Sequence, residues 1–298
     1  MMMLAQPSAH IIHDIVYLKP DNYDSHIITN GWCAQDIFTS FFNALSNSKS
    51  TTSITILKQQ FELLFASIFL DSESSNISNI SNMTNLFYKL IAYTRDIKGL
   101  GHYTHSYMLV VELFKFGNKY EREVNKEAIQ TNAYLLLEMF AKKYGSWKDI
   151  KYFLNYYVED LSKDKKRDLD NDFFIKKIVK MVCEQMKAES NSVNAKWLPR
   201  EKSNKFGWLT PLFAREYYSE WFSETMSPGQ YKAATRKALT HFRQLISKLN
   251  KQFEASQTMD LNKKATKKSF NCVNKIMNWD TIVNELTNIR YNDLDNLI

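Results

Sequence analysis

One seven-residue segment of the sequence places an aromatic ring among three cations, a combination that can bind a nucleotide. Its members are Lys196, Trp197, Arg200 and Lys202. An indole ring can stack on a base while ammonium and guanidinium groups beside it neutralise the phosphates. The same residues also fit a buried tryptophan whose neighbouring cations pair with carboxylates. The sequence alone leaves both interpretations open.

A second basic segment follows a predicted helix. Arg95 and Lys98 precede Gly99 and Gly101 in the turn after that helix. The helix macrodipole favours cations at a C-terminal end, and the backbone amides of a glycine turn can bind an anion. We therefore take Arg95 and Lys98 as candidate phosphate contacts, with a plain cation-capped helix end as the alternative.

A third basic feature is a helix predicted over residues 228–250. Ser227, Pro228 and Gln230 give it a capping residue, a first-turn proline and a capping-box partner. An apolar stripe with a spacing of three or four residues runs along it: Tyr231, Ala234, Ala238, Phe242, Leu245 and Leu249. Cations border this stripe, and we expect Arg236 and Lys237 to contact phosphates. An ordinary amphipathic surface helix is the alternative.

Catalytic and metal-binding patterns find little support in the sequence. The six histidines form no H-E-x-x-H motif, and the seven glycines form no phosphate-binding loop. Cys33, Cys183 and Cys272 are far apart and form no C-x-x-C pair, which favours reduced core thiols in a reducing compartment. The sequence therefore predicts a non-catalytic protein with no cofactor and no metal site.

The charge balance indicates an anionic partner. Thirty-nine Lys and Arg residues against 32 Asp and Glu residues give a net charge of +7 over 298 residues, which favours nucleic acid, an anionic membrane or an acidic protein. No apolar run approaches the roughly 18 residues that cross a bilayer, and the first residues do not resemble a secretory signal. We expect a cytoplasmic protein without a membrane partner.

The spacing of apolar residues predicts an all-α protein. Glycine and proline are scarce, 7 and 5 in number, and fall between apolar-periodic stretches. Helices are predicted over residues 32–45, 54–70, 85–94, 102–116, 126–144 and 173–188. Gly99 with Gly101, Gly117 and Gly145 are expected to end three of these helices. Ser146 and Asp149 form a predicted capping box for a further helix that reaches about residue 161.

The expected organisation is one repeat domain. Residues 1–30 show no regular spacing of apolar residues and are predicted to be an irregular N-terminal segment. Residues 31–298 are predicted to form a single α-helical repeat domain. Short turns between its helices favour antiparallel hairpins. A Ser/Asn-rich stretch over residues 71–82 is expected to form a flexible loop.

Three of these motifs, in the same order, resemble a TROVE-related family catalogued as domain of unknown function 2828. They are Arg95-Asp96 with its glycine turn, Tyr144 to Asp149, and Ala195 to Pro199; the helix after Ser227 and Asn278-Trp279-Asp280 follow. The resemblance covers roughly residues 85–280. Relatives are similar to the RNA-binding module of the Ro autoantigen. The resemblance implies a HEAT-like α-solenoid of helical hairpins, curved into a partial ring, with RNA as the ligand.

The sequence departs from this family in two places. His102-Tyr103-Thr104-His105 stand where relatives have basic and acidic residues after the glycine turn. Relatives also continue into a von Willebrand factor A domain, which this sequence does not contain. We therefore expect either a free-standing module or one that finds a protein partner in trans. Family members occur in large DNA viruses, so the expected location is the host cytoplasm or the virion.

The function expected from these features is that of a non-catalytic, RNA-binding helical scaffold that takes single-stranded or structured RNA. The predicted contacts are Arg95, Lys98, Lys196, Arg200, Lys202, Arg236 and Lys237, with Trp197 as a stacking residue. The alternative is a protein–protein interaction scaffold, for example a viral structural or assembly component. Strong salt dependence of binding would favour RNA.

Overall fold

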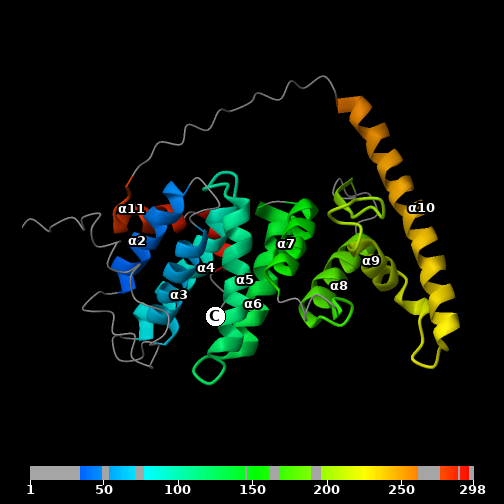
Figure 1. Ribbon diagram of the computed structural model, residues 1–298. Coiled ribbons are helices and arrows are strands. Elements are labelled where there is room, and N and C mark those ends of the chain that lie inside the picture. Colours follow the sequence, from blue (N-terminus) through cyan, green and yellow to red (C-terminus); the bar gives the residue numbers. More distant parts are fainter. Residues whose placement is uncertain are drawn as a thin grey trace, which may run out of the picture. The chain divides into compact units, whose positions relative to one another are not determined.

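Every secondary-structure element in the described part of the chain is helical, which confirms the predicted all-α class there. The computed structural model describes residues 34–48, 54–70, 77–144, 146–161, 168–188, 196–260, 276–287 and 289–294. Its α-helices are α2 (Ala34–Asn47), α3 (Ile54–Phe69), α4 (Ile77–Arg95), α5 (Tyr103–Lys119), α6 (Lys126–Met139), α7 (Trp147–Asp160), α8 (Phe173–Ala188), α9 (Leu209–Tyr217), α10 (Pro228–Asp260) and α11 (Trp279–Leu286) (Figure 1). None of the described helices is long and apolar enough to cross a membrane.

The chain divides into two compact units. The first unit comprises Met1–Leu136 and Asn271–Ile298, and the second unit comprises Leu137–Phe270. Consecutive helices pack against each other within each unit: α2 on α3 and α4 on α5 in the first, and α8 on α9 and α9 on α10 in the second. The predicted irregular segment, residues 1–30, lies outside the described residues.

Stacked aromatic rings form the core of the first unit. Phe61 and Phe87 stack with centroids 5.2 Å apart, and Phe65 lies 5.0 Å from Phe116. Phe61, Phe65 and Phe87 are fully buried. Burying a phenylalanine side chain stabilises a fold by about 1.5–3 kcal/mol, so these rings hold α3, α4 and α5 together.

The C-terminal segment returns to the first unit. α11 packs on α2 and α4, and the 3₁₀ helix Ile289–Leu294 packs on α4 (Figure 1). The Asn43 side chain donates to the Met277 carbonyl at 2.9 Å and accepts from its amide at 2.8 Å. Trp279 meets Phe38 edge to face at 5.7 Å. The first unit is therefore built from two segments far apart in sequence.

The predicted flexible loop over residues 71–82 is wrong in its second half. α4 begins at Ile77 instead of residue 85, and residues 71–76 lie outside the described residues. Ile77, Ile80 and Thr84 keep a spacing of three or four residues, which is helical periodicity. The Ser and Asn residues between them concealed it, because these residues are also typical of loops.

Gly117 does not end α5, contrary to prediction. The helix continues to Lys119, and a Cβ added at Gly117 would lie 3.2 Å from a methyl group of Ile129 in α6. Glycine at this position therefore lets the two helices approach closely. At the other two predicted ends, α4 stops at Arg95 before Gly99, while Gly145 lies outside the described residues.

Local capping chemistry sets the starts of α7, where the capping box was predicted, and of α8, whose cap was not. Asp149 accepts a hydrogen bond from the Ser146 amide at 2.8 Å, and the Lys148 amide donates to the Ser146 hydroxyl at 3.3 Å. α8 has its predicted bounds, and Asp172 caps it by accepting from the Ile175 amide at 2.9 Å. These side chains satisfy amides that have no partner within the helix.

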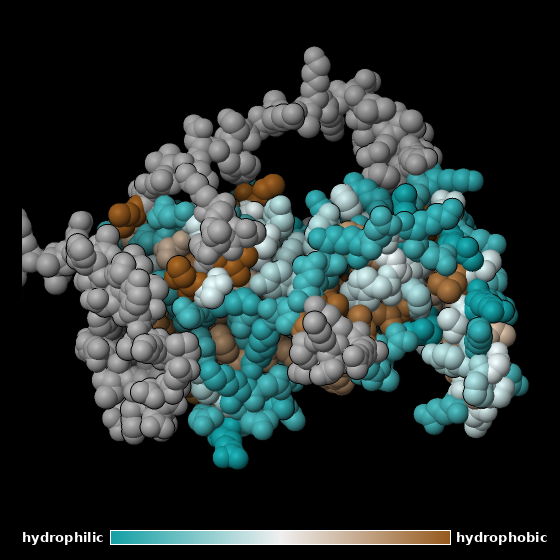
Figure 2. Space-filling view, in the orientation of Figure 1, coloured by the Kyte–Doolittle hydropathy of each residue, from teal (hydrophilic) through white to brown (hydrophobic). Residues whose placement is uncertain are grey.

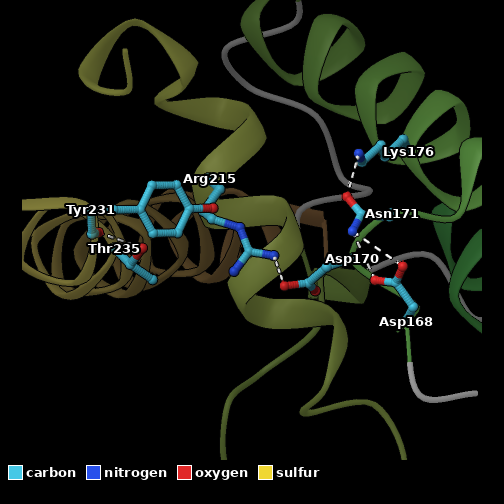
Figure 3. Close-up of polar contacts among 7 residues, drawn as sticks. All are labelled: Asp168, Asp170, Asn171, Lys176, Arg215, Tyr231 and Thr235. Atoms are coloured by element: carbon cyan, nitrogen blue, oxygen red, sulfur yellow. Dashed lines mark hydrogen bonds and ion pairs between the residues drawn. The ribbon is translucent and has the colours of Figure 1, made fainter. Parts of the chain in front are cut away.

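The turn before α8 is held to α9. Arg215 pairs with Asp170 at 2.9 Å, and Asn171 donates to Asp168 at 2.9 Å, so that polar side chains fix this turn (Figure 3). α9 itself was not predicted, and α10 continues ten residues beyond its predicted end at residue 250 to Asp260. Arg215 thereby ties α9 to the turn that precedes α8.

Candidate functional site

The second unit carries a group of cations gathered around three aromatic rings, which we call the cationic–aromatic cluster. The cations come from α7 and from the segment that precedes α9. They are Lys148, Lys151, Lys196, Arg200 and Lys205, and the rings are Tyr152, Trp197 and Phe206.

α7 presents two of these lysines on one face. Lys148 and Lys151 are three residues apart and Tyr152 is four residues after Lys148, so all three lie on neighbouring positions of the helix surface. The capping box at Ser146 fixes where the helix begins. It therefore also fixes which way these side chains project.

A tight turn positions the rest of the cluster. The Gly207 amide donates to the Ser203 carbonyl at 2.8 Å, and the Phe206 amide donates to the Ser203 hydroxyl at 3.2 Å. A Cβ at Gly207 would lie 2.6 Å from the carbonyl oxygens of Glu201 and Ser203. Only glycine fits here, and the turn buries Phe206 beside Tyr152 of α7, with ring centroids 4.9 Å apart.

Lysine ammonium groups surround the half-buried Trp197 ring. The Nζ atoms of Lys148, Lys151 and Lys196 lie 5.2, 5.4 and 5.3 Å from its centroid. Lys151 also lies 4.9 Å from the centroid of Phe206. Such distances are typical of cation–π attraction. The Trp197 ring is therefore already in contact with lysines. A base could stack on a lysine-covered face of the ring only if that lysine moved away.

Like charges crowd the centre of the cluster. Burial lowers the pKa of Lys151, and repulsion from Arg200 and Lys148 lowers it further. Among the described residues, no carboxylate forms an ion pair with Lys148, Lys151 or Arg200. Glu201 in the adjacent turn pairs instead with Arg243 of α10 at 3.5 Å. A bound anion would relieve this repulsion.

The structure brings three of the predicted contacts together, namely Lys196, Trp197 and Arg200. Sequence reasoning missed Lys151 and Lys205, together with the rings of Tyr152 and Phe206. Lys148 was noticed as a cation beside a turn but was not included among the predicted contacts. The Lys-x-x-Lys-Tyr spacing at the start of α7 was an available signal. Lys202 is exposed in the same turn, outside the group around the three rings.

Lys237 belongs to a different place in the second unit. Its Nζ lies 4.5 Å from the ring centroid of Trp221, which stacks on Tyr218 at 4.3 Å and meets His241 at 5.1 Å. Arg236 is exposed on the neighbouring position of α10. The surface over α10, at the right of the view, is largely hydrophilic (Figure 2). α10 thus offers a second, smaller combination of cation and ring.

Arg95 and Lys98 lie in the first unit, at the end of α4. The amides of Gly99 and Gly101 donate to the Asp96 carbonyl at 3.0 and 2.9 Å. The Lys98 amide donates to the Asp96 carboxylate at 3.0 Å. These amides are therefore satisfied inside the turn, and a phosphate contact at Arg95 and Lys98 would use their side chains and stays a prediction.

Two histidines of the first unit lie side by side. The rings of His102 and His105 are 5.3 Å apart, and His105 Nε2 lies 3.2 Å from the Ser48 hydroxyl. Burial lowers the pKa of both imidazoles. Within the described ranges, no group of three or more His, Cys, Asp or Glu residues could hold a metal ion.

The fold and the cluster define an all-helical protein with a cation-rich aromatic surface. No protein family matches the sequence, and neither a curated protein nor a solved structure is significantly similar to it. The TROVE resemblance thus rests on its short motifs. Two of these motifs supply residues of the cationic–aromatic cluster: Tyr144 to Asp149 supplies Lys148, and Ala195 to Pro199 supplies Lys196 and Trp197.

Proposed function

We propose that this protein binds single-stranded RNA through the cationic–aromatic cluster. The observation that carries the proposal is the convergence of three lysine ammonium groups, 5.2 to 5.4 Å from the Trp197 centroid. Arg200 adds a fourth positive charge, near enough to Lys151 to lower the pKa of that lysine by repulsion. Single-stranded RNA suits such a surface because its phosphates meet the cations and its unpaired bases can reach exposed ring edges.

The charges at the cluster support a polyanionic ligand. Two lysines and an arginine without ion pairs repel one another at this site, and the pKa of the half-buried Lys151 is lowered by burial and further by this repulsion. Phosphate oxygens accept strong charge-assisted hydrogen bonds from ammonium and guanidinium groups. Neutralising phosphates also releases counterions, which adds to affinity at low salt.

The finer arrangement that we propose is a HEAT-like α-solenoid of the TROVE type. Sequential packing of neighbouring helices within each unit supports it, because repeats of a solenoid contact their neighbours. The packing of α11 on α2 joins helices that are not consecutive and is an additional contact beyond those of a simple solenoid. In this arrangement the protein acts as a non-catalytic scaffold that takes RNA on its basic surface.

A binding titration tests the proposed function. Fluorescently labelled single-stranded and structured RNA would be titrated with the whole chain at 50 and 200 mM salt, conditions between which phosphate-dominated binding weakens by orders of magnitude. The triple variant Lys148→Ala, Lys151→Ala, Arg200→Ala should weaken binding by about 100-fold at the lower salt. Absence of binding by the unaltered chain at 50 mM salt would overturn the proposal.

A control variant removes the same charge elsewhere. Lys126, Lys142 and Lys180 each lie beside a surface carboxylate, at 3.0, 2.5 and 4.0 Å. Replacing all three by alanine lowers the net charge by three, as the cluster variant does. We expect this control to bind RNA within about threefold of the unaltered chain, since exposed pairs lie outside the cluster. An equal loss of RNA affinity in both triple variants would show that only the net charge matters. It would refute the cluster as the binding site.

A further inference from the structure

We infer that the exposed side of α10 is a docking surface for an acidic helix of a partner protein. The inference goes beyond the proposed function, because α10 contributes no residue to the cationic–aromatic cluster. It rests on the exposed cations that follow one another along this helix. We call them the basic face of α10: Lys232, Arg236, Lys237, Arg243, Lys248 and Lys251.

The opposite side of α10 is occupied within the second unit. Ala238, Phe242 and Ile246 are buried and lie four residues apart, which places them along one side of the helix. Phe242 packs against Phe213 and Tyr217 of α9, with ring centroids 6.5 and 6.2 Å away. The apolar side of α10 is therefore covered by its own unit, and a partner meets the basic face instead.

The basic face consists of two rows of cations. At about 3.6 residues per turn, Lys232, Arg236 and Arg243 lie within about 40° of one another around the helix axis, and Lys237 and Lys248 form a second row roughly 120° away. The midline between the rows points away from the buried side. At about 1.5 Å per residue, the rows extend over about 24 Å of the helix.

The chain itself supplies few negative charges to the basic face. No Asp or Glu occurs in α10 before Glu254. Within the described ranges, Arg243 pairs with Glu201 at 3.5 Å, and no carboxylate forms an ion pair with Lys232 or Lys248. Cations on one side of a helix repel one another at spacings of three and four residues. Carboxylates of a partner would relieve this repulsion.

An acidic helix fits the two rows because of its width. A helix with its side chains is about 10–12 Å across, so it can lie between two rows of long, flexible cations and meet both. Glutamates spaced three and four residues apart would line the two sides of such a helix. An extended acidic segment is narrower and would meet one row at a time.

Other anionic partners match the basic face less well. Stable binding of a helix to a membrane surface draws on buried apolar side chains, whereas the surface over α10 is largely hydrophilic (Figure 2). Single-stranded nucleic acid uses rings beside the cations. Among the described members of the basic face, only Lys237 lies over a ring, that of Trp221. The charge pattern therefore favours a protein helix.

The test uses two synthetic helical peptides of about 20 residues, a length that covers the basic face. Both contain the same number of glutamates, which occupy one side of the helix in the first peptide and are spread around it in the second. The whole chain would be titrated with each peptide at low salt. We expect the one-sided peptide to bind about 10-fold more tightly, because only this peptide can meet both rows. Equal affinities, or no binding of either peptide, would overturn the inference.

Variants locate the bound peptide. The triple variant Lys232→Ala, Arg236→Ala, Lys248→Ala should bind the one-sided peptide about 10-fold more weakly, and alanine preserves the helix, which circular dichroism verifies. The charge-matched control described for RNA binding should keep its peptide affinity within about twofold. Replacing the same three α10 residues by glutamate should give a chain that binds a one-sided lysine peptide. Unchanged peptide affinity in the alanine variant would refute the inference.

Crossed measurements separate this inference from the proposed function. The α10 alanine variant should keep its RNA affinity within about threefold, and the cluster variant Lys148→Ala, Lys151→Ala, Arg200→Ala should likewise keep its peptide affinity. An equal weakening of both ligands by both variants would indicate one shared surface for polyanions and overturn the inference. Intact peptide binding without RNA binding would overturn the proposed function alone. Tighter binding to phosphatidylserine vesicles than to the peptide, lost in the α10 variant, would assign the basic face to membranes and refute the inference.

Discussion

The Tyr291 hydroxyl donates a 2.9 Å hydrogen bond to the Asp96 carboxylate, although 195 residues separate the two in sequence. Both side chains are buried, with exposed fractions of 3% and 0%. Asp96 is the first residue after α4, and Tyr291 lies in the 3₁₀ helix after α11. The turn that carries Arg95 and Lys98 is therefore built on a contact from the far end of the chain.

This contact should measurably stabilise the first unit. Tyr291→Phe removes one hydrogen bond from a buried carboxylate and leaves the ring in place, so we expect a loss of about 1.5–3 kcal/mol in the free energy of unfolding. Urea denaturation followed by tryptophan fluorescence and circular dichroism measures it. Tyr103→Phe, at a ring that is 57% exposed, is the control and should change stability by less than about 0.5 kcal/mol. Equal values for the two variants would contradict this account.

Glycine in the turn after α4 should be required. A Cβ at Gly99 would lie 2.2 Å from the Tyr93 carbonyl oxygen, and Gly101 has a φ of +67°. We expect Gly101→Ala to cost about 1 kcal/mol of stability and Gly99→Ala more than that. Gly229→Ala is the matched control because nothing lies within 4 Å of its position, and it should be neutral. Thermal denaturation of the three variants measures these differences in stability.

Acidification should weaken the first unit. The pKa values of His102 and His105 are lowered from 6.5 by burial, and for His105 also by His102. The unfolded chain therefore binds protons first, so stability is lost as the pH falls from about 6.5 towards the folded pKa values and stays low below them. Denaturation at pH 7.5 and 5.5 measures the loss. The double variant His102→Gln, His105→Gln should lose less, and an unchanged pH dependence in it would assign the effect to other groups.

Lys151 should lower the stability of the fold while it contributes to RNA binding. Lys151→Met removes a half-buried charge that Arg200 and Lys148 repel. After a discount for solvent screening, we expect stability to rise by about 0.5 kcal/mol, while RNA affinity falls. Lys180→Met, at an exposed position beside Glu184, should change neither. A variant that lost stability and affinity together would indicate a structural role for Lys151.

The salt dependence of RNA binding should show how many cations contact phosphates. For a single strand, each phosphate contact adds about 0.7 to the slope of log affinity against log salt. Arg200→Ala should lower the slope by about that amount. Lys237→Ala tests the pair formed by Lys237 of α10 and Trp221 in the same way. An unchanged slope in Lys237→Ala would exclude this lysine from the RNA contact.

Features set by neighbouring residues could be predicted from the sequence. The capping box at Ser146, the bounds of α8 and the start of α10 at Pro228 all follow from residues within one helical turn. The helical start at Ile77 was missed because Ser and Asn fit both a loop and a helix surface. The extent of α10 to Asp260 was also missed, since apolar periodicity fades in its last turns.

Contacts between distant segments could not be predicted from local patterns. The grouping of Lys196, Trp197 and Arg200 lies within five residues and was recognised, whereas Lys151 meets them only because α7 packs beside this segment. The Tyr291–Asp96 hydrogen bond likewise has no local signature. A single sequence contains no pattern that pairs such residues, because their proximity arises only from tertiary packing.

The return of α11 to α2 also sets an order of events during synthesis. Phe38 meets Trp279, and Asn43 pairs with Met277, so α2 is synthesised well before the segment that packs on it. The second unit is complete in sequence by Phe270 and can fold in the meantime. The first unit can therefore be completed only after the second unit has been synthesised, and until then Phe38 lacks the contact that Trp279 makes with it.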